Sequence, residues 1–139
     1  MKADKIQIYS DGGARGNPGP AAIGVVLCDS KGTVIYEHRE IIGEATNNTA
    51  EYTAVIVGLE LAKAQDAKTI EYFVDSELVA NQLTGTYKIK TPHILTLANK
   101  VRASMALFEK VSFKQIPRTH EKIKHADRLV NQALDEGGY

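Results

Sequence analysis

The chain has 139 residues, 43% of them hydrophobic, and carries no net charge at pH 7. This size and composition are typical of one soluble globular domain, which we expect to span residues 1–139. The longest apolar run, residues 21–28, is far shorter than the ~20 residues of a membrane-spanning helix. We recognise no secretory signal, and the lone Cys28 cannot form an internal disulfide. We therefore expect a cytoplasmic monomer with no membrane and no obligate protein partner.

The first third of the sequence predicts three strands. Residues 5–11 alternate between polar and apolar, residues 21–29 form an apolar run, and residues 33–42 are rich in β-branched side chains. The short glycine-containing stretch 29–32 predicts a hairpin turn between the second and third strands. Residues 11–20 contain so many glycines and prolines that we expect irregular structure there.

The remaining sequence alternates between helical and extended patterns. The expected elements are a buried helix over residues 47–65, a strand over 69–75, a short helix over 76–83, a helix that begins at Thr91–Pro92, a strand over 110–116 and a last helix that begins at Asp127. The predicted order is βββαβααβα. It indicates an α/β fold with a five-stranded mixed sheet, antiparallel on one side and parallel on the other, flanked by helices.

Four acids stand at element ends or beginnings in this prediction. Asp11 and Asp75 follow two strands that we expect to be parallel neighbours, Glu51 lies in the first turns of the buried helix, and Asp127 opens the last helix. Taken singly, each acid also suits a turn or a helix start. Because sites in open α/β sheets gather at the carboxyl ends of strands, we expect the four carboxylates to converge.

Such a cluster of carboxylates requires a cation to neutralise it, and the absence of a cysteine or histidine cluster favours Mg²⁺, with Mn²⁺ as a substitute, over zinc. Two ions that bridge a phosphodiester would explain the number of acids. Nearby, Asn17, Asn47 and Asn48 offer neutral groups that suit ribose 2′-hydroxyls, although turn or cap chemistry is the alternative.

Charge is distributed unevenly along the chain. Residues 86–124 contain nine lysines and arginines but only two acids, a local net charge of +7 (nine minus two). A basic segment beside an acidic site favours a polyanionic substrate, while a solvated lysine-rich face is the alternative.

The strongest resemblance lies in four segments: residues 9–20 (YSDGGARGNPGP), 46–51 (TNNTAE), 74–76 (VDS) and 126–129 (ADRL). In this order they resemble the type 1 ribonuclease H family. The resemblance implies a ribonuclease H-like fold and endonucleolytic cutting of the RNA strand of RNA–DNA hybrids, which leaves 5′-phosphate and 3′-hydroxyl ends. It implies two Mg²⁺ ions with substrate and assigns roles as follows: metal ligands at Asp11, Glu51, Asp75 and Asp127, RNA contacts at Gly12, Gly13, Asn17 and Asn48, a DNA contact at Asn47 and a DNA-phosphate contact at Thr46.

Two departures from that family's pattern affect the expected substrate binding and turnover. The chain contains no tryptophan, and residues 86–92 are too short for the tryptophan-rich basic handle of many relatives. In the segment before Asp127, where relatives place a mobile histidine or glutamate, His120, Glu121 and His125 are all candidates. We favour His120 for its distance from Asp127, with an exposed structural histidine as the alternative.

Two other functions remain open from the sequence. A non-catalytic hybrid-binding module would be disfavoured by retaining acids beside phosphates, since they weaken binding. Another nuclease of the same fold, acting on DNA, is disfavoured by the ribose-directed asparagines.

Overall fold

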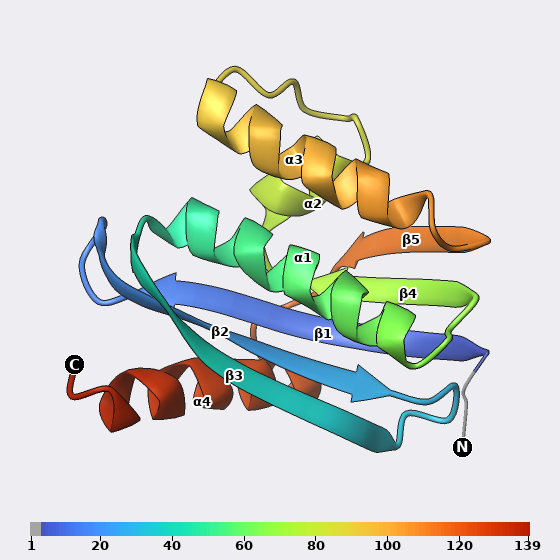
Figure 1. The fold of residues 1–139 in the computed structure, drawn as a ribbon, viewed down its shortest axis with the longest axis horizontal. Coiled ribbons are helices and arrows are strands. Elements are labelled where there is room, and N and C mark those ends of the chain that lie inside the picture. The colour runs from blue at the N-terminus through green and yellow to red at the C-terminus, as the bar shows by residue number, and fades with distance from the viewer. Residues whose placement is uncertain (1–3) are drawn as a thin grey trace.

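The computed structural model describes residues 4–139, which form a five-stranded sheet and four helices (Figure 1). The strands are β1 (Lys5–Ala14), β2 (Gly19–Cys28), β3 (Val34–Ala45), β4 (Thr69–Val74) and β5 (Lys110–Gln115). The helices are α1 (Asn47–Ala64), α2 (Glu77–Leu83), α3 (Pro92–Met105) and α4 (Glu121–Glu136). The sheet order is β3-β2-β1-β4-β5, antiparallel from β3 to β1 and parallel from β1 to β5. The predicted element order and mixed sheet are confirmed.

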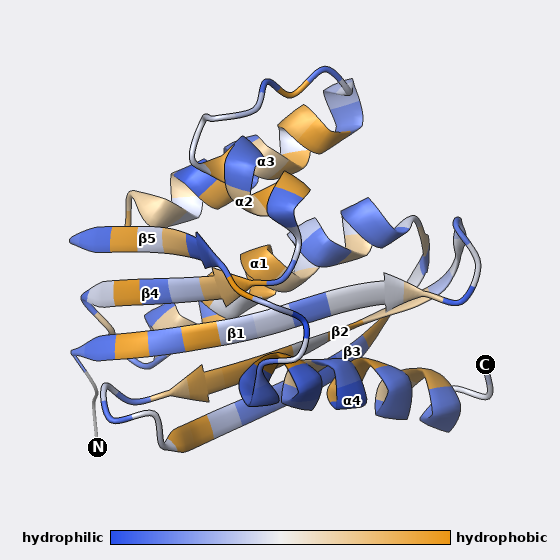
Figure 2. Cartoon of the chain, turned by 180° about the vertical axis from the view of Figure 1, so that it is seen from behind, coloured by the Kyte–Doolittle hydropathy of each residue, from blue (hydrophilic) through white to orange (hydrophobic). Residues whose placement is uncertain are grey.

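Two layers of helices cover the two faces of the sheet. Helix α1 lies against β1 and β2 on one face, with α3 packed on it, whereas α4 lies across β1, β2 and β3 on the other face (Figures 1 and 2). The alternation of β1 explains both contacts, because Ile6 and Ile8 belong to the core cluster of α1 while Tyr9 belongs to that of α4. Within the described residues, no helix has the length and apolar character needed to span a membrane.

The hairpin that joins β2 and β3 forms at the predicted place. One carboxylate oxygen of Asp29 accepts the N–H groups of Lys31 and Thr33, over 2.9 and 3.0 Å. Gly32 adopts a positive φ of 85°, which a residue with a side chain rarely takes. The turn chemistry read from the sequence is therefore confirmed.

The glycine-rich segment after Asp11 is more regular than we predicted. Strand β1 continues through Gly12 to Ala14, because these residues pair with the beginning of β2 in an antiparallel ladder. Only residues 15–18 remain as the connecting turn. Asp11 consequently lies inside a strand rather than at its end, and our prediction of irregular structure over residues 11–20 was wrong for its outer parts.

The last helix begins six residues earlier than we predicted. Helix α4 starts at Glu121, not at Asp127, because the ring Nδ1 of His120 accepts the Lys122 N–H over 3.1 Å and caps the first turn. Ile123, fully buried, continues the apolar face of the helix toward its N-terminus. Asp127 therefore lies in the second turn of α4, where it has no role in capping the helix.

Candidate active site

Strands β1 and β4 place Asp11 and Asp75 side by side. Their parallel pairing ends at Tyr9 opposite Phe73, and each acid follows two residues later on its own chain. Strand β4 stops at Val74, whereas β1 continues, as Figure 2 shows. An opening at the end of β4 therefore lies beside Asp11, as expected for the carboxyl end of a parallel strand pair.

Helix α1 brings Glu51 to the same opening. A side-chain oxygen of each of Asp11, Glu51 and Asp75 lies within 4.8 Å of the others. The helix approaches β1 closely at Gly12, where a Cβ atom would lie 2.3 Å from the carbonyl carbon of Ala50. The sequence prediction that these three carboxylates converge is therefore supported by the geometry.

Asp127 approaches from α4, on the opposite face of the sheet, and is not one of the three acids whose oxygens lie within 4.8 Å of one another. Its charge is nevertheless among those that raise the pKa of Asp11. A cleft of about 270 Å³ contains both groups and is lined by Asp11, Gly12, Gly13, Asn47, Glu51, Arg118 and Asp127. Asp11, Glu51, Asp75 and Asp127 are called the acid cluster below.

Burial and mutual repulsion disfavour ionisation of this cluster. Burial, followed by the charges of Asp75 and Asp127, raises the pKa of Asp11 to about 8. Burial likewise raises the pKa of Glu51 to about 7, although a hydrogen bond from Ser76 opposes the shift. Both shifts have the direction expected where carboxyl groups are gathered away from water with little positive charge nearby.

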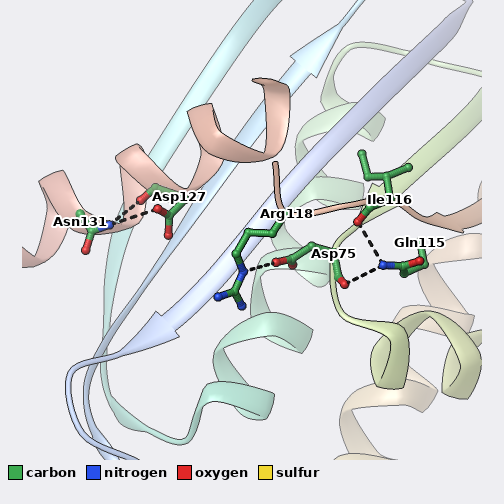
Figure 3. Close-up of polar contacts among 6 residues, drawn as sticks. All are labelled: Asp75, Gln115, Ile116, Arg118, Asp127 and Asn131. Atoms are coloured by element: carbon green, nitrogen blue, oxygen red, sulfur yellow. Dashed lines mark hydrogen bonds and ion pairs between the residues drawn. The ribbon is translucent and has the colours of Figure 1, made fainter. Parts of the chain in front are cut away.

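Arg118 supplies part of that charge. Its Nε donates to Asp75 Oδ2 over 3.1 Å, and the amide Nε2 of Gln115 donates to the Asp75 backbone carbonyl over 3.2 Å (Figure 3). The hydrogen bond to Asp75 and its charge raise the pKa of the Arg118 guanidinium. Our sequence reasoning counted Arg118 only as part of the basic segment. Its place between the last strand and Asp127 was the available signal.

The donor set fits a divalent cation with oxygen ligands. Three carboxylate oxygens lie close together, two of the groups have raised pKa values, and the guanidinium beside them is 84% exposed. Oxygen ligands of this kind are those that Mg²⁺ and Mn²⁺ take in proteins, and a bound cation would lower the cost of ionising them.

A second region of neutral groups adjoins the acid cluster. The turn and α1 are tied together by their asparagines: Asn17 Oδ1 accepts the Asn47 N–H over 3.0 Å, and Asn47 Oδ1 accepts the Ala14 N–H over 2.9 Å. A cavity of about 580 Å³, called the amide cavity below, is lined by Asn17, Thr46, Asn47, Asn48, Thr49, Thr91, His93 and Ile94. The turn-and-cap alternative thus accounts for the side-chain oxygens of Asn17 and Asn47.

The three candidates for a proton-transfer role lie in different surroundings. The ring of His120 stacks on Tyr9 with centroids 5.3 Å apart, in addition to capping α4. His125 Nε2 lies 2.7 Å from a carboxylate oxygen of Glu37 on β3. Glu121 is exposed in the first turn of α4. All three therefore belong to the beginning of α4 rather than to the loop that we predicted.

Comparison with known proteins identifies the group to which this chain belongs. The family described as "Reverse transcriptase-like" matches residues 9–133. Ribonuclease HI of Halobacterium salinarum is 40% identical over 136 residues, which cover 97% of this chain and 67% of that protein. The chain is a member of the type 1 ribonuclease H family. This membership confirms the resemblance found in the four sequence segments.

Two further relatives of this chain extend the comparison. LC11-RNase H1, isolated from compost, has a crystal structure in complex with an RNA/DNA hybrid. It is 42% identical to this chain, and the two structures superpose with a TM-score of 0.90 over 96% of this chain and 99% of that one. Bifunctional protein Rv2228c of Mycobacterium tuberculosis is 40% identical over 94% of this chain but only 36% of its own length. The chain thus spans about a third of that mycobacterial protein.

Proposed function

We propose that this chain is a metal-dependent endonuclease that hydrolyses the RNA strand of RNA–DNA hybrids. The observation that carries the proposal is the acid cluster: carboxylate oxygens from β1, α1 and the end of β4 lie within 4.8 Å of one another, and Asp127 of α4 lines the cleft beside them. The family membership and the hybrid complex of LC11-RNase H1 support the choice of substrate.

The acid cluster would hold two Mg²⁺ ions when substrate is present. Bound there, the ions would activate water and stabilise the leaving 3′ oxygen, so that the products carry 5′-phosphate and 3′-hydroxyl ends. Asp11, Glu51, Asp75 and Asp127 are the proposed ligands. Arg118 orients Asp75 through the hydrogen bond from its Nε.

The groups around the turn and the amide cavity would orient the two strands of the hybrid. We assign RNA ribose contacts to Asn17, Asn48 and the backbone at Gly12 and Gly13, since amide and peptide groups can pair with 2′-hydroxyls. Gly12 and Gly13 line the same cleft as the acids, which supports their place beside the scissile strand. We assign contacts with the DNA strand to Asn47 and Thr46.

We retain His120 as the proposed group for proton transfer or product release. Among the three candidates it is the one that stacks on Tyr9, two residues before Asp11 on β1. Replacing His120 with alanine should lower kcat with little change in KM. Because the change also removes the helix cap, His120→Asn, which keeps a capping side chain, is the matched variant; equal kcat values for His120→Asn and the unmodified protein would reject the role.

A strand-specific cleavage assay tests the proposal directly. Four duplexes of one sequence, namely RNA–DNA, RNA–RNA, DNA–DNA and a DNA duplex with one ribonucleotide, are each labelled on either strand and incubated with Mg²⁺, Mn²⁺ or EDTA. We expect cleavage of the RNA strand of the hybrid with either metal and none with EDTA. Binding without cleavage would indicate a hybrid-binding module, and cleavage of DNA–DNA would indicate a different nuclease of this fold.

A further inference from the structure

Helix α4 lies very close to the sheet at Gly24 of β2. A Cβ atom at this position would lie 2.2 Å from the backbone carbonyl oxygen of Ala126 and 2.8 Å from the Cβ of Leu129. A side-chain rotation cannot relieve a clash with backbone, so the helix itself would have to move. The missing side chain of Gly24 therefore sets how near α4 lies to the sheet.

This contact occurs beside two members of the acid cluster. Gly24 is the cross-strand partner of Asp11 in the β1–β2 ladder. On the helix, Ala126 directly precedes Asp127, which lines the same cleft as Asp11. The close approach at Gly24 thus occurs where a carboxylate of the sheet and one of the helix line the same cleft.

The opposite face of the sheet shows the same arrangement. Gly12 follows Asp11, and a Cβ there would lie 2.3 Å from the carbonyl carbon of Ala50 and 2.6 Å from the amide nitrogen of Glu51. Gly13 differs, because a Cβ at that position would meet only Val130, at an ordinary contact distance of 3.6 Å. At both Gly12 and Gly24, the backbone of the neighbouring helix leaves no room for a side chain. In each case the helix residue that comes closest directly precedes an acid of the acid cluster.

We propose that Gly24 is a positioning residue for Asp127: any side chain at position 24 would lift α4 and withdraw the Asp127 carboxylate from Asp11. The relevance to catalysis rests on the proposed function. The placement itself does not, and it can be measured in the metal-free protein without any cleavage assay.

A double-mutant cycle on stability tests this placement. The unmodified protein, Asp127→Asn, Gly24→Ala and the double variant are unfolded by heat in EDTA at pH 9, where ionised carboxylates that line one cleft repel each other. We expect Asp127→Asn to raise the Tm of the unmodified protein by about 3 °C. In the Gly24→Ala background the same change should raise Tm by less than a third of that amount.

Leu134→Ala is the matched control for lost stability. Leu134 is buried under the C-terminal half of α4, in a cluster with Ala22, Val130 and Ala133, so its truncation leaves a cavity but does not push the helix away. Asp127→Asn should keep its full effect in this background. An undiminished effect of Asp127→Asn in Gly24→Ala would overturn the proposal.

If Gly24→Ala does not fold, Leu129→Phe takes its place, because it adds volume on the helix side of the same contact. The expected and the contradicting outcomes are unchanged.

A second readout is kcat at saturating metal. Gly24→Ala alone should reduce kcat at least tenfold, yet it should cause no further loss when added to Asp127→Asn. Independent losses in the two variants would contradict a role through Asp127, whereas absent cleavage by the unmodified protein would reject only the proposed function.

Discussion

The acid cluster and the amide cavity are neighbours that differ in how their polar groups are satisfied. In the acid cluster, burial and like charge raise the pKa values of Asp11 and Glu51. In the amide cavity, the oxygens of Asn17 and Asn47 already accept backbone N–H groups. One region is therefore electrostatically incomplete without a cation, and the other is formed before any ligand arrives.

This difference separates chemistry from recognition on one surface. The first turns of α1 serve both regions, since Asn47 and Asn48 line the amide cavity while Glu51 reaches the acid cluster. Changes in the acid cluster should therefore affect kcat and metal binding, and changes in the amide cavity should affect KM. Substitutions in each region can test this division.

The largest effect is expected from Asp75→Asn. Loss of one carboxylate from the three that lie within 4.8 Å should reduce kcat at least about a thousandfold, equivalent to ~4 kcal/mol of transition-state stabilisation. Binding of the hybrid should persist, because the variant removes negative charge beside phosphates. Single-turnover cleavage and fluorescence anisotropy on the same hybrid measure the two quantities.

Glu60→Gln is the control for Asp75→Asn. Glu60 is exposed on α1 and lines neither the acid cluster nor the amide cavity. It should cleave at the normal rate. Undiminished cleavage by Asp75→Asn would remove the acid cluster from the mechanism altogether.

The second effect is a loss of stability of the metal-free protein as pH rises. Asp11 ionises near pH 3.8 when unfolded but near pH 8 when folded, so between these values the folded state binds more protons. The free energy of unfolding should therefore fall as pH rises through that window, and Glu51 adds to the fall between about pH 4.5 and 7. Below pH 4 neither group contributes a slope.

Asp11→Asn should remove most of this dependence. At pH 8 in EDTA the variant should be more stable than the unmodified protein by up to about 5 kcal/mol, because it carries no charge to bury. Urea unfolding from pH 4 to 9 measures the difference. Mg²⁺ at pH 8 should stabilise the unmodified protein and not the variant; a flat pH profile for the unmodified protein would show that the acid cluster is not strained.

Much of the fold and the approach of three of the acids to one another could be predicted from the sequence. The alternation of residues 5–11, the apolar spacing in residues 47–65 and the turn at residues 29–32 depend on local chemistry, and the structure confirms the elements they predicted. The convergence of Asp11 and Asp75 followed from strand order, since the parallel pairing of β1 with β4 stops two residues before each acid, and Glu51 reaches the same place from α1.

The errors occurred where tertiary contacts override local preference. Gly12 reads as a turn residue, but pairing with β2 and the close approach of α1 keep it in a strand. The α4 start was missed because its cap is the ring of His120, which is not among the usual capping residues. Arg118 was not singled out because its partner, Asp75, is 43 residues away.

A third effect should separate the amide cavity from the acid cluster. Asn48→Ala removes an exposed amide that lines the cavity, so KM for the hybrid should rise about tenfold, ~1.4 kcal/mol, with kcat within about twofold of normal. Steady-state kinetics at saturating Mg²⁺ measure both constants. Asn99→Ala, on the exposed surface of α3, should change neither. A fall in kcat at constant KM would place Asn48 with the acids.

The smallest effect is expected from Arg118→Met, which tests whether Arg118 substitutes for a cation beside Asp75. The Asp75 side chain is only 7% exposed, but the guanidinium is 84% exposed, so solvent screens the pair and its loss should cost about 1 kcal/mol in EDTA. The same change should tighten Mn²⁺ binding a few-fold, since a competing positive charge is removed. Urea unfolding and calorimetric titration measure the two quantities, with the exposed Arg128→Met as the control. Weaker Mn²⁺ binding in Arg118→Met would show instead that the arginine holds Asp75 in the orientation that the metal needs.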